Sequence, residues 1–223
     1  MRGLGFVSKQ FRNARILAFG YDPERVSIST WEQQFSSGAW KRLESIPEMG
    51  HYSITIGLCA LLSKKKILDV CCGQGILAER LKYLPYEKYI GIDISASAVR
   101  EASMLRADAR NQYLVADAKV FSSNEMFDMV IFHECLYYLD DPIGIIRHYI
   151  RYLEPNGHIL VSMYDSIRSR AVWKLLNMEL MVDDGVQITH ISGASWTVKT
   201  LVPISKQAGP KVSTQRSFKA SAA

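Results

Sequence analysis

The sequence predicts an α/β fold in which helices cover both faces of a mostly parallel sheet. Apolar segments of strand length alternate with stretches of helical spacing, which is typical of βαβ units. Several of these segments end in an acid or a histidine, and right-handed crossovers bring such strand ends to one edge of the sheet. Open parallel sheets bind ligands beyond the carboxyl ends of their strands, so we expect one site there. The five segments are 66–70, 89–95, 112–118, 127–134 and 158–164.

Length and composition favour a single core with an extension at each end. The chain has 223 residues, of which 48% are hydrophobic, enough for one sizeable core but too few for two full domains with linkers. We expect three parts. They are an N-terminal extension and helical lid at 1–63, a core at 64–203 and a mobile basic tail at 204–223.

The positive charge of the chain is confined to its ends. The formal net charge is +5, yet residues 1–20 and 204–223 together carry eight basic residues and no acid. The body between them is therefore negative, by about three charges. A basic stripe across the folded body is not indicated, and we expect no nucleic-acid partner.

The cysteines and the apolar runs bear on compartment. Cys59, Cys71, Cys72 and Cys135 show no zinc-type pairing and no regular spacing, which favours a reduced, cytoplasmic setting. No apolar run reaches the length of a membrane span, so none is expected. The arginine-containing, acid-free start also resembles an organelle transit peptide, which leaves an organellar location as the alternative. The same start is equally compatible with a short surface helix or a frayed end, and the oligomeric state has no sequence signal.

The segment before the first strand is expected to be helical. A helix begins near Ser29 or Thr30, either of which is a suitable cap. It breaks around 36–38, where two serines precede a glycine, and then resumes. A further helix is expected at 49–62, directly before the lysines that lead into the first strand.

A glycine-rich turn joins the first strand to a helix at 76–84. Gly73 and Gly75 carry no Cβ, so they can take positive φ and let a ligand approach the backbone. The free N–H groups at the start of the new helix face the same space. Asp93 follows about twenty residues later, at the spacing of a ribose-binding acid, where it can accept bonds from both ribose hydroxyls.

The remaining elements follow from caps and turns. Ser95 or Ser97 caps the helix after the second strand. Two late strands separated by a glycine turn are expected to pair as an antiparallel hairpin. The expected positions are helices at 143–153 and 166–181, a turn at 154–157, and strands at 186–192 and 196–202.

Four motifs in order resemble those of the class I S-adenosylmethionine-dependent methyltransferases. Residues 69–75 resemble the family's D-x-G-x-G-x-G loop, Asp93 its ribose acid, Asp117 its adenine-contacting acid, and 127–139 its fourth-strand motif. The last of these is most similar to small-molecule methyltransferases, including nodulation-type N-methyltransferases. The resemblance covers residues 50–203, and Cys71 departs from it by standing where the first loop glycine usually is.

The resemblance implies a Rossmann-like, seven-stranded, mostly parallel sheet with an antiparallel C-terminal strand and an N-terminal helical lid. It implies S-adenosyl-L-methionine as cofactor and S-adenosyl-L-homocysteine as product. In related enzymes a basic residue near the position of His51 contacts the cofactor's carboxylate, and here ordinary packing is an equal alternative. The residues expected at the cofactor are Asp69, Cys71, Gly73, Gly75, Asp93, Ile94, Asp117, Ala118, His133, His51 and Trp31.

Methyl transfer from a sulfonium needs alignment of the acceptor more than bond activation. A base is useful when the acceptor is a hydroxyl or an ammonium. His133, Glu134 and Tyr138 lie at or just beyond the end of the fourth strand, and they are the expected catalytic residues. Among them we expect His133 to be the base or the group that orients the acceptor, with Glu134 as the second choice. In the alternative, His133 only lines the cofactor, Glu134 caps a turn and the tyrosine forms a wall.

We therefore expect transfer of a methyl group to an oxygen or nitrogen of a small molecule, by in-line displacement without a metal. No cluster of carboxylates and histidines has metal-ligand spacing. A nicotinamide-dependent oxidoreductase is the main alternative, since it also uses a glycine loop and a ribose acid. A non-catalytic module that binds S-adenosylmethionine as a regulator is the other.

Overall fold

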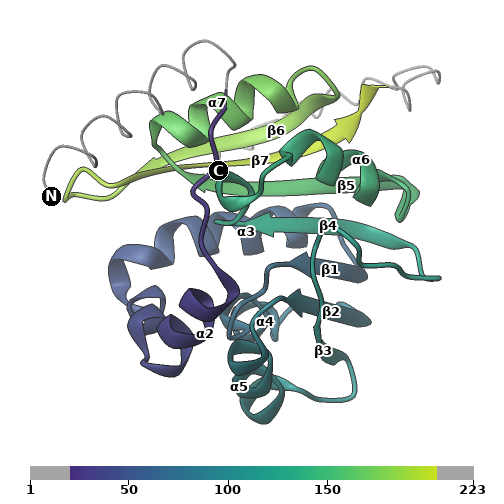
Figure 1. The fold of residues 1–223 in the computed structure, drawn as a ribbon. Helices are drawn as coiled ribbons and strands as arrows, with labels where there is room; N and C mark the ends of the chain where they lie inside the picture. Colours follow the sequence, from purple (N-terminus) through teal and green to yellow (C-terminus); the bar gives the residue numbers. More distant parts are fainter. Residues whose placement is uncertain (1–20, 205–223) are drawn as a thin grey trace, which may run out of the picture.

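The computed structural model describes residues 21–204, which form a seven-stranded sheet with the order β3-β2-β1-β4-β5-β7-β6 (Figure 1). Strands β1 to β5 run parallel, and β7 lies antiparallel to both of its neighbours. The predicted fold is thereby confirmed, including its antiparallel C-terminal strand. The strands are β1 Lys66–Val70, β2 Lys88–Asp93, β3 Asn111–Val115, β4 Phe127–His133, β5 Leu153–Tyr164, β6 Leu180–Thr189 and β7 Ser195–Pro203.

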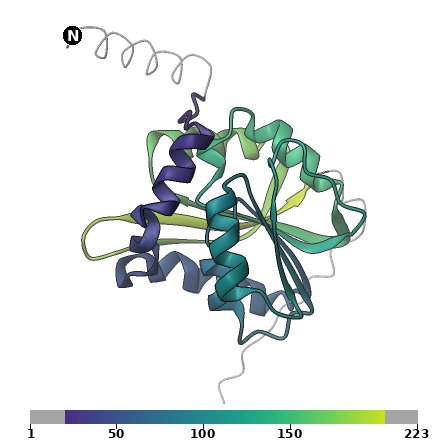
Figure 2. The ribbon, with the colours of Figure 1, turned by 60° about the horizontal axis from the view of Figure 1, so that its bottom comes forward.

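Helices cover both faces of the sheet (Figures 1 and 2). One apolar cluster joins the sheet to α3, α4 and α5, and a second joins its opposite face to α6 and α7. The helices are α2 Ile28–Ser36, η1 Ala39–Glu44, η2 Ile46–Glu48, α3 Met49–Leu61, α4 Ile76–Leu81, α5 Ala96–Arg106, η3 Leu136–Tyr138, α6 Pro142–Ile150 and α7 Ile167–Leu176. None of these helices is long and apolar enough to cross a membrane.

The central strands are apolar on both faces, because both faces are buried. In β1, Ile67 belongs to one cluster while Leu68 and Val70 belong to the other. In β4, Ile131 and Phe132 divide in the same way. Near-continuous aliphatic runs are the expected signature of parallel strands covered on two sides. Parallel pairing of Val70 with both Ile92 and Phe132 places the carboxyl ends of β1, β2 and β4 at one edge, as the pattern predicts.

Several of the predicted boundaries are wrong, and the largest differences lie in the C-terminal half. Strand β5 begins at Leu153 and includes the predicted turn at 154–157, where its pairing with β4 shifts register. A Cβ on Gly157 would lie 3.0 Å from two backbone oxygens, so a glycine fits this irregular strand start. Helix α7 ends at Leu176, and β6 begins at Leu180 because it pairs with β7 along its whole length.

The N-cap of helix α2 lies two or three residues before the predicted one. Ser27, rather than Ser29 or Thr30, is the N-cap, and its Oγ accepts a hydrogen bond from the backbone N–H of Thr30 at 3.1 Å. The predicted break is present, with Gly38 at φ +74°. The chain then continues as two short 3-10 helices. The predictions for 1–20 and 205–223 lie outside the described residues.

Helix α3, which the sequence placed in the lid, packs on the sheet. His51, Tyr52, Thr55, Leu58 and Cys59 are buried on its inner face. Its contacts are with β5, β6, β7 and α4. The part of the chain that lies over the edge of the sheet is therefore α2 with η1.

Glu32 fastens α2 to the start of α5, and the two helices lie side by side (Figure 2). Its carboxylate accepts hydrogen bonds from the backbone N–H of Ala96 at 2.5 Å and of Ser97 at 3.1 Å, and from the Ser97 hydroxyl. The first N–H groups of a helix have no partner within the helix, so a carboxylate there satisfies them. The hydrogen bond from the Ser97 side chain is the largest cause that lowers the pKa of Glu32.

Replacement of Glu32 by alanine is expected to loosen the lid while leaving the core folded. The backbone amides of α2 should exchange with deuterium faster, because local opening no longer breaks these hydrogen bonds. Hydrogen exchange followed by mass spectrometry measures this. The control is Gln33→Ala on the exposed side of the same helix. Equal protection of α2 in both variants would contradict a fastening role for Glu32.

A buried carboxyl lies at the end of β1. Asp69 is 1% exposed, and its Oδ2 accepts a hydrogen bond from the hydroxyl of Tyr89 on β2 at 2.5 Å. Burial raises the pKa of Asp69 from 3.8 to about 7, and the bond from Tyr89 opposes that rise. The folded protein therefore holds this proton to a higher pH than the unfolded chain does.

The Asp69→Asn variant is expected to show a flatter dependence of stability on pH. In the parent protein the unfolded chain loses this proton near pH 4 and the folded protein only near pH 7, so the free energy of unfolding falls across that interval. The contribution is up to about 4 kcal/mol. Urea unfolding at a series of pH values measures it, with Asp184→Asn on exposed β6 as control. Parallel curves for Asp69→Asn and the parent would contradict the buried, protonated carboxyl.

Candidate active site

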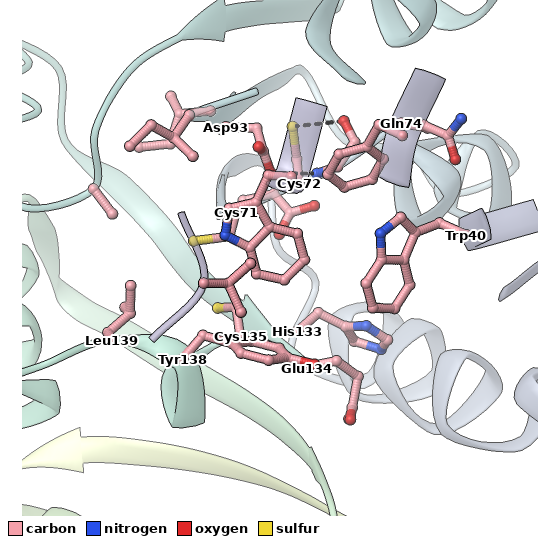
Figure 3. Close-up of a pocket in the computed structure, with 18 of the residues that line it drawn as sticks. Trp40, Cys71, Cys72, Gln74, Asp93, His133, Glu134, Cys135, Tyr138 and Leu139 are labelled. Atoms are coloured by element: carbon pink, nitrogen blue, oxygen red, sulfur yellow. Dashed lines mark hydrogen bonds between the residues drawn. The ribbon is translucent and has the colours of Figure 1, made fainter. Parts of the chain in front are cut away.

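A cavity of about 520 Å³ lies where β1, β2 and β4 end (Figure 3). The loops after these strands form one side of it. The side chains of α2 and η1 form the other, including Trp31, Phe35 and Trp40. Its size is within the range of small-molecule sites in proteins. The sequence-predicted site at the carboxyl ends of the strands therefore coincides with a cavity.

The loop after β1 has three residues in the left-handed region. Cys71 has φ +63°, Gly73 has φ +54° and Gly75 has φ +77°. Such a φ suits glycine and costs other residues of order 1 kcal/mol or more, so Cys71 adopts a glycine-like backbone geometry at some strain. Cys71 and Gly73 line the cavity. Gly75 is the N-cap of α4 and lies outside the lining; a Cβ there would meet the ring of Tyr113 at 2.9 Å.

Asp93 connects the loops that follow β1 and β2. Its Oδ2 accepts a hydrogen bond from the backbone N–H of Gly73, and its Oδ1 accepts one from that of Ser95, both at 2.9 Å. The residue is 7% exposed and lines the cavity. Burial raises the pKa of Asp93, and the two backbone donors oppose that rise. Each oxygen retains a lone pair for a further donor.

One oxygen of Asp69 has no hydrogen-bond partner among residues 21–204. Asp69 lines the cavity, and its Oδ1 is buried without a hydrogen bond to any of the described residues. A buried acceptor without a donor is costly, and each such group in a folded protein calls for an explanation. A ligand that brings a positively charged or N–H donor into the cavity supplies one.

The loops after β2 and β3 form the next part of the wall. Ile94, Asp117 and Ala118, which are expected from the sequence to lie at the cofactor, line the cavity. The Oδ1 of Asp117 accepts a hydrogen bond from the backbone N–H of Lys119 at 2.9 Å, which fixes this turn. Its second oxygen is free to accept from a ligand.

Aromatic rings form the lid side of the cavity. The ring of Trp31 meets that of Tyr138 edge to face at 5.1 Å, and it lies 5.8 Å from that of Trp40 and 6.2 Å from that of Phe35. These rings come from α2, η1 and η3, so packing among them brings lid and core together. Trp31, expected at the cofactor, and Tyr138, expected to be catalytic, are therefore in contact.

His133 ends β4 and lines the cavity. Its Nε2 is 3.2 Å from Nδ1 of His51, and the two rings stack at 4.8 Å. Burial lowers the pKa of His133 well below its usual value, and His51 and Arg80 lower it further. The imidazole is accordingly neutral at physiological pH, with a lone pair available to take up a proton.

Glu134 also lines the cavity, but its carboxylate is occupied. It accepts hydrogen bonds from the Ser162 hydroxyl at 2.7 Å, the Tyr164 backbone N–H at 2.8 Å and the Tyr137 hydroxyl at 2.9 Å. Burial raises the pKa of Glu134, against the effect of these donors. The backbone is in the left-handed region at φ +59°, held by these bonds. This arrangement favours a structural role over that of a base.

Nearly all of the predicted site residues gather around this one cavity. The exceptions are Gly75, described above, and His51, which lies behind His133 with its side chain fully buried. Those that line the cavity are Trp31, Asp69, Cys71, Gly73, Asp93, Ile94, Asp117, Ala118, His133, Glu134 and Tyr138.

Sequence reasoning missed several residues at the cavity. Arg25, Lys119 and Asp140 lie at its lining, where Lys119 pairs with Asp140 at 2.7 Å. It also missed Glu48, whose Oε2 is 3.0 Å from Nε2 of His51. Glu48 and His51 are three residues apart, which on a helix places them on one face, so this pair had a detectable signal. Arg25, Lys119 and Asp140 had no such signal in the sequence.

A model of the methyltransferase domain family matches residues 54–214, well over half of the chain. Among curated proteins, Nodulation protein S of Sinorhizobium fredii is 32% identical over 98 residues, which is 42% of this chain and 44% of the relative. The ubiquinone biosynthesis O-methyltransferase of Pseudomonas putida (strain GB-1) is 35% identical over 107 residues, 46% of each chain. The chain thus spans less than half the length of these curated relatives.

Solved structures agree on the fold. The N-methyltransferase NodS from Bradyrhizobium japonicum WM9, in complex with S-adenosyl-L-homocysteine, superposes with a TM-score of 0.66 at 20% identity. The match covers 78% of this chain and 98% of that one. At this identity the likeness concerns the fold, whereas the family follows from the domain match. This chain is a member of the methyltransferase domain family.

Proposed function

We propose that this chain transfers a methyl group from S-adenosyl-L-methionine to an oxygen or nitrogen atom of a small molecule. The observation that carries the proposal is the pair of buried carboxylates at the strand ends, Asp69 and Asp93. Both line one cavity beside a glycine loop, and Asp69 keeps an unpartnered oxygen. An amino acid joined to a nucleoside brings an ammonium and two ribose hydroxyls, which are the donors that such acceptors lack.

Different residues of the cavity bind different parts of the cofactor. Asp93 accepts the ribose hydroxyls, since its two backbone donors leave lone pairs free. Asp69 accepts the ammonium through its unpartnered oxygen, and this positive charge favours the ionised carboxylate over the protonated form that burial favours in the protein without ligand. Cys71 and Gly73 let the cofactor approach the loop. Ile94, Asp117 and Ala118 surround the base, with Asp117 accepting from its amino group. When bound, the cofactor supplies a methyl group on a sulfonium, a good leaving group.

The chain's own residues align the acceptor and exclude water. Trp31, Trp40 and Tyr138 enclose the lid side, so a flat or apolar acceptor is held against the rings. His133 takes the acceptor's proton, because its neutral ring lines the same cavity. Glu134 holds the β4 and β5 ends in register through Ser162 and Tyr164.

A small-molecule acceptor fits this enclosed, aromatic cavity better than a nucleic acid does. The relatives include an enzyme named as an O-methyltransferase and one named as an N-methyltransferase, and both acceptor atoms remain within the proposal. The four cysteines are free thiols, which supports a reducing, cytoplasmic setting. We further propose that α2 and η1 act as the lid of a core that runs from α3 to β7.

A nicotinamide-dependent oxidoreductase is disfavoured, because the family model that matches this chain is that of a methyltransferase domain. A regulator that binds S-adenosylmethionine without turnover would use the same cavity, so only a test of turnover separates it from an enzyme. The position of His133 at the cavity favours the enzyme, because its imidazole places a group that can take up a proton beside the bound ligands.

S-adenosylhomocysteine is expected to raise the midpoint of thermal unfolding, and NAD is not. At about one hundred times its dissociation constant, a ligand of the native state adds about 2.7 kcal/mol. For a chain of this length that corresponds to a rise of about 5–10 °C. Differential scanning fluorimetry with each nucleotide measures it.

The rise should disappear in Asp93→Asn and persist in Glu87→Gln, a control that changes an exposed carboxylate beside the opposite end of β2. The midpoint of each variant without ligand shows that it is folded. A rise of the midpoint with NAD alone, or no rise with S-adenosylhomocysteine, would contradict S-adenosylmethionine as the cofactor.

A further inference from the structure

Glu48, His51 and His133 form a hydrogen-bonded chain that leads from the cavity toward the surface. The distance from Glu48 Oε2 to His51 Nε2 is 3.0 Å, and that from His51 Nδ1 to His133 Nε2 is 3.2 Å. His51 is fully buried, and the side chain of Glu48 is 14% exposed. His133 lines the cavity, so the chain connects the reaction space with a carboxylate near solvent.

Neighbouring rings hold the two imidazoles in place. Trp196 of β7 stacks on His51 at 4.9 Å with an interplanar angle of 20°. Tyr52 of α3 stacks on His133 at 4.4 Å with an angle of 26°. Four elements, η2, α3, β4 and β7, therefore fix the geometry of the chain. Side chains locked in this way lose little entropy when a proton moves along them.

Several charged groups face this chain. Arg42 of η1 donates to Glu48 at 3.0 Å, and Arg80 of α4 lies over the ring of Tyr52 at 4.4 Å. Glu134 and Asp69 lie near the ring of Tyr52 but are bonded elsewhere. Glu134 accepts a hydrogen bond from Ser162, and Asp69 accepts one from Tyr89. Among the described acids, Glu48 is the one bonded to the histidine pair.

The hydrogen-bond pattern fixes the tautomers when both rings are neutral. The bond from His51 is the largest cause that lowers the pKa of Glu48, so this carboxylate is ionised and only accepts. Nε2 of His51 must then carry a proton, which leaves a lone pair on its Nδ1. Nε2 of His133 donates to that lone pair. Nδ1 of His133 bonds to no residue in the described part of the chain, and it is left as the basic nitrogen.

We propose that Glu48 and His51 are positioning residues that make His133 a base and store the proton that it removes. The proposal rests on methyl transfer as the function of the cavity. An O–H or N–H proton of the acceptor moves to Nδ1 of His133 while the Nε2 proton of His133 moves to Nδ1 of His51. The acceptor keeps the electron pair of the broken bond. The positive charge then lies on His51, opposite the Glu48 carboxylate, and no redox partner is needed.

This transfer avoids a charged ring at the cavity. Burial makes an imidazolium costly at His133, with Arg80 nearby. A carboxylate bonded to the other ring stabilises the charge there, as the buried acid does for the histidine of a serine hydrolase. The transfer also changes the tautomer of His133, which passes from the Nε2–H form to the Nδ1–H form when the proton reaches His51.

The test is long-range ¹H–¹⁵N correlation spectroscopy of the full chain from about pH 5 to about pH 8, with and without S-adenosylhomocysteine. His133 is assigned from the spectrum of His133→Gln. We expect the Nε2–H form at high pH and a change to Nδ1–H as the pH falls. In Glu48→Gln the midpoint of this change should move to lower pH by about one unit or more, because the carboxylate that favours the protonated pair is gone.

The controls separate this relay from a general loss of structure. Glu44→Gln removes another lid carboxylate, one paired with Arg106 at 3.1 Å, and should leave the midpoint unchanged. Glu48→Asp keeps a carboxylate and should restore part of the change if Glu48→Gln folds poorly. The Nδ1–H form at every pH, or an equal midpoint in folded Glu48→Gln, would overturn the relay. Calorimetry of S-adenosylhomocysteine binding on the same samples tests the cofactor separately, so binding with an unchanged tautomer overturns the relay alone.

Discussion

A buried carboxylate must find hydrogen-bond donors, and this constraint at the ends of β1 and β2 determines how the rest of the site is built. Asp93 takes its donors from the backbone N–H groups of Gly73 and Ser95, so the glycine loop and the start of α5 are held at fixed positions. Asp69 has one donor, Tyr89, and no second donor in the part of the chain that the structure describes. The missing donor leaves a buried acceptor beside the glycine loop, and this acceptor favours a ligand whose positive group lies next to the loop.

The position of the lid depends on the same carboxyl-end edge of the sheet. Glu32 of α2 bonds to the first N–H groups of α5, the helix that Asp93 helps to place through Ser95. Aromatic rings from the lid then close over the cavity and meet Tyr138 beyond β4. Loss of register at the strand ends would therefore loosen both the carboxylate network and the cover above it.

Local signals in the sequence predicted most of the fold and the polar half of the site. The glycine loop, Asp93 and the strand ends lie within short segments, and the sheet topology brings them together by a general rule. The start of β5 was hidden because Glu154, Pro155 and Gly157 read as a turn, yet pairing with β4 makes them strand. The start of β6 was hidden because the predicted helix extends to residue 181, whereas pairing with β7 makes the chain a strand from Leu180. The bond between His51 and His133 spans 82 positions and follows from tertiary packing alone.

The central claim is that the cavity carries out methyl transfer to a small molecule, and the most direct measurement is the fate of a labelled methyl group. The protein is incubated with S-adenosylmethionine carrying a tritiated methyl and with a cell extract separated by dialysis into small molecules and macromolecules. The account predicts label in a dialysable product, formed in step with S-adenosylhomocysteine and reduced in His133→Gln. Label found only in macromolecules, or tight cofactor binding without any transfer, would contradict it.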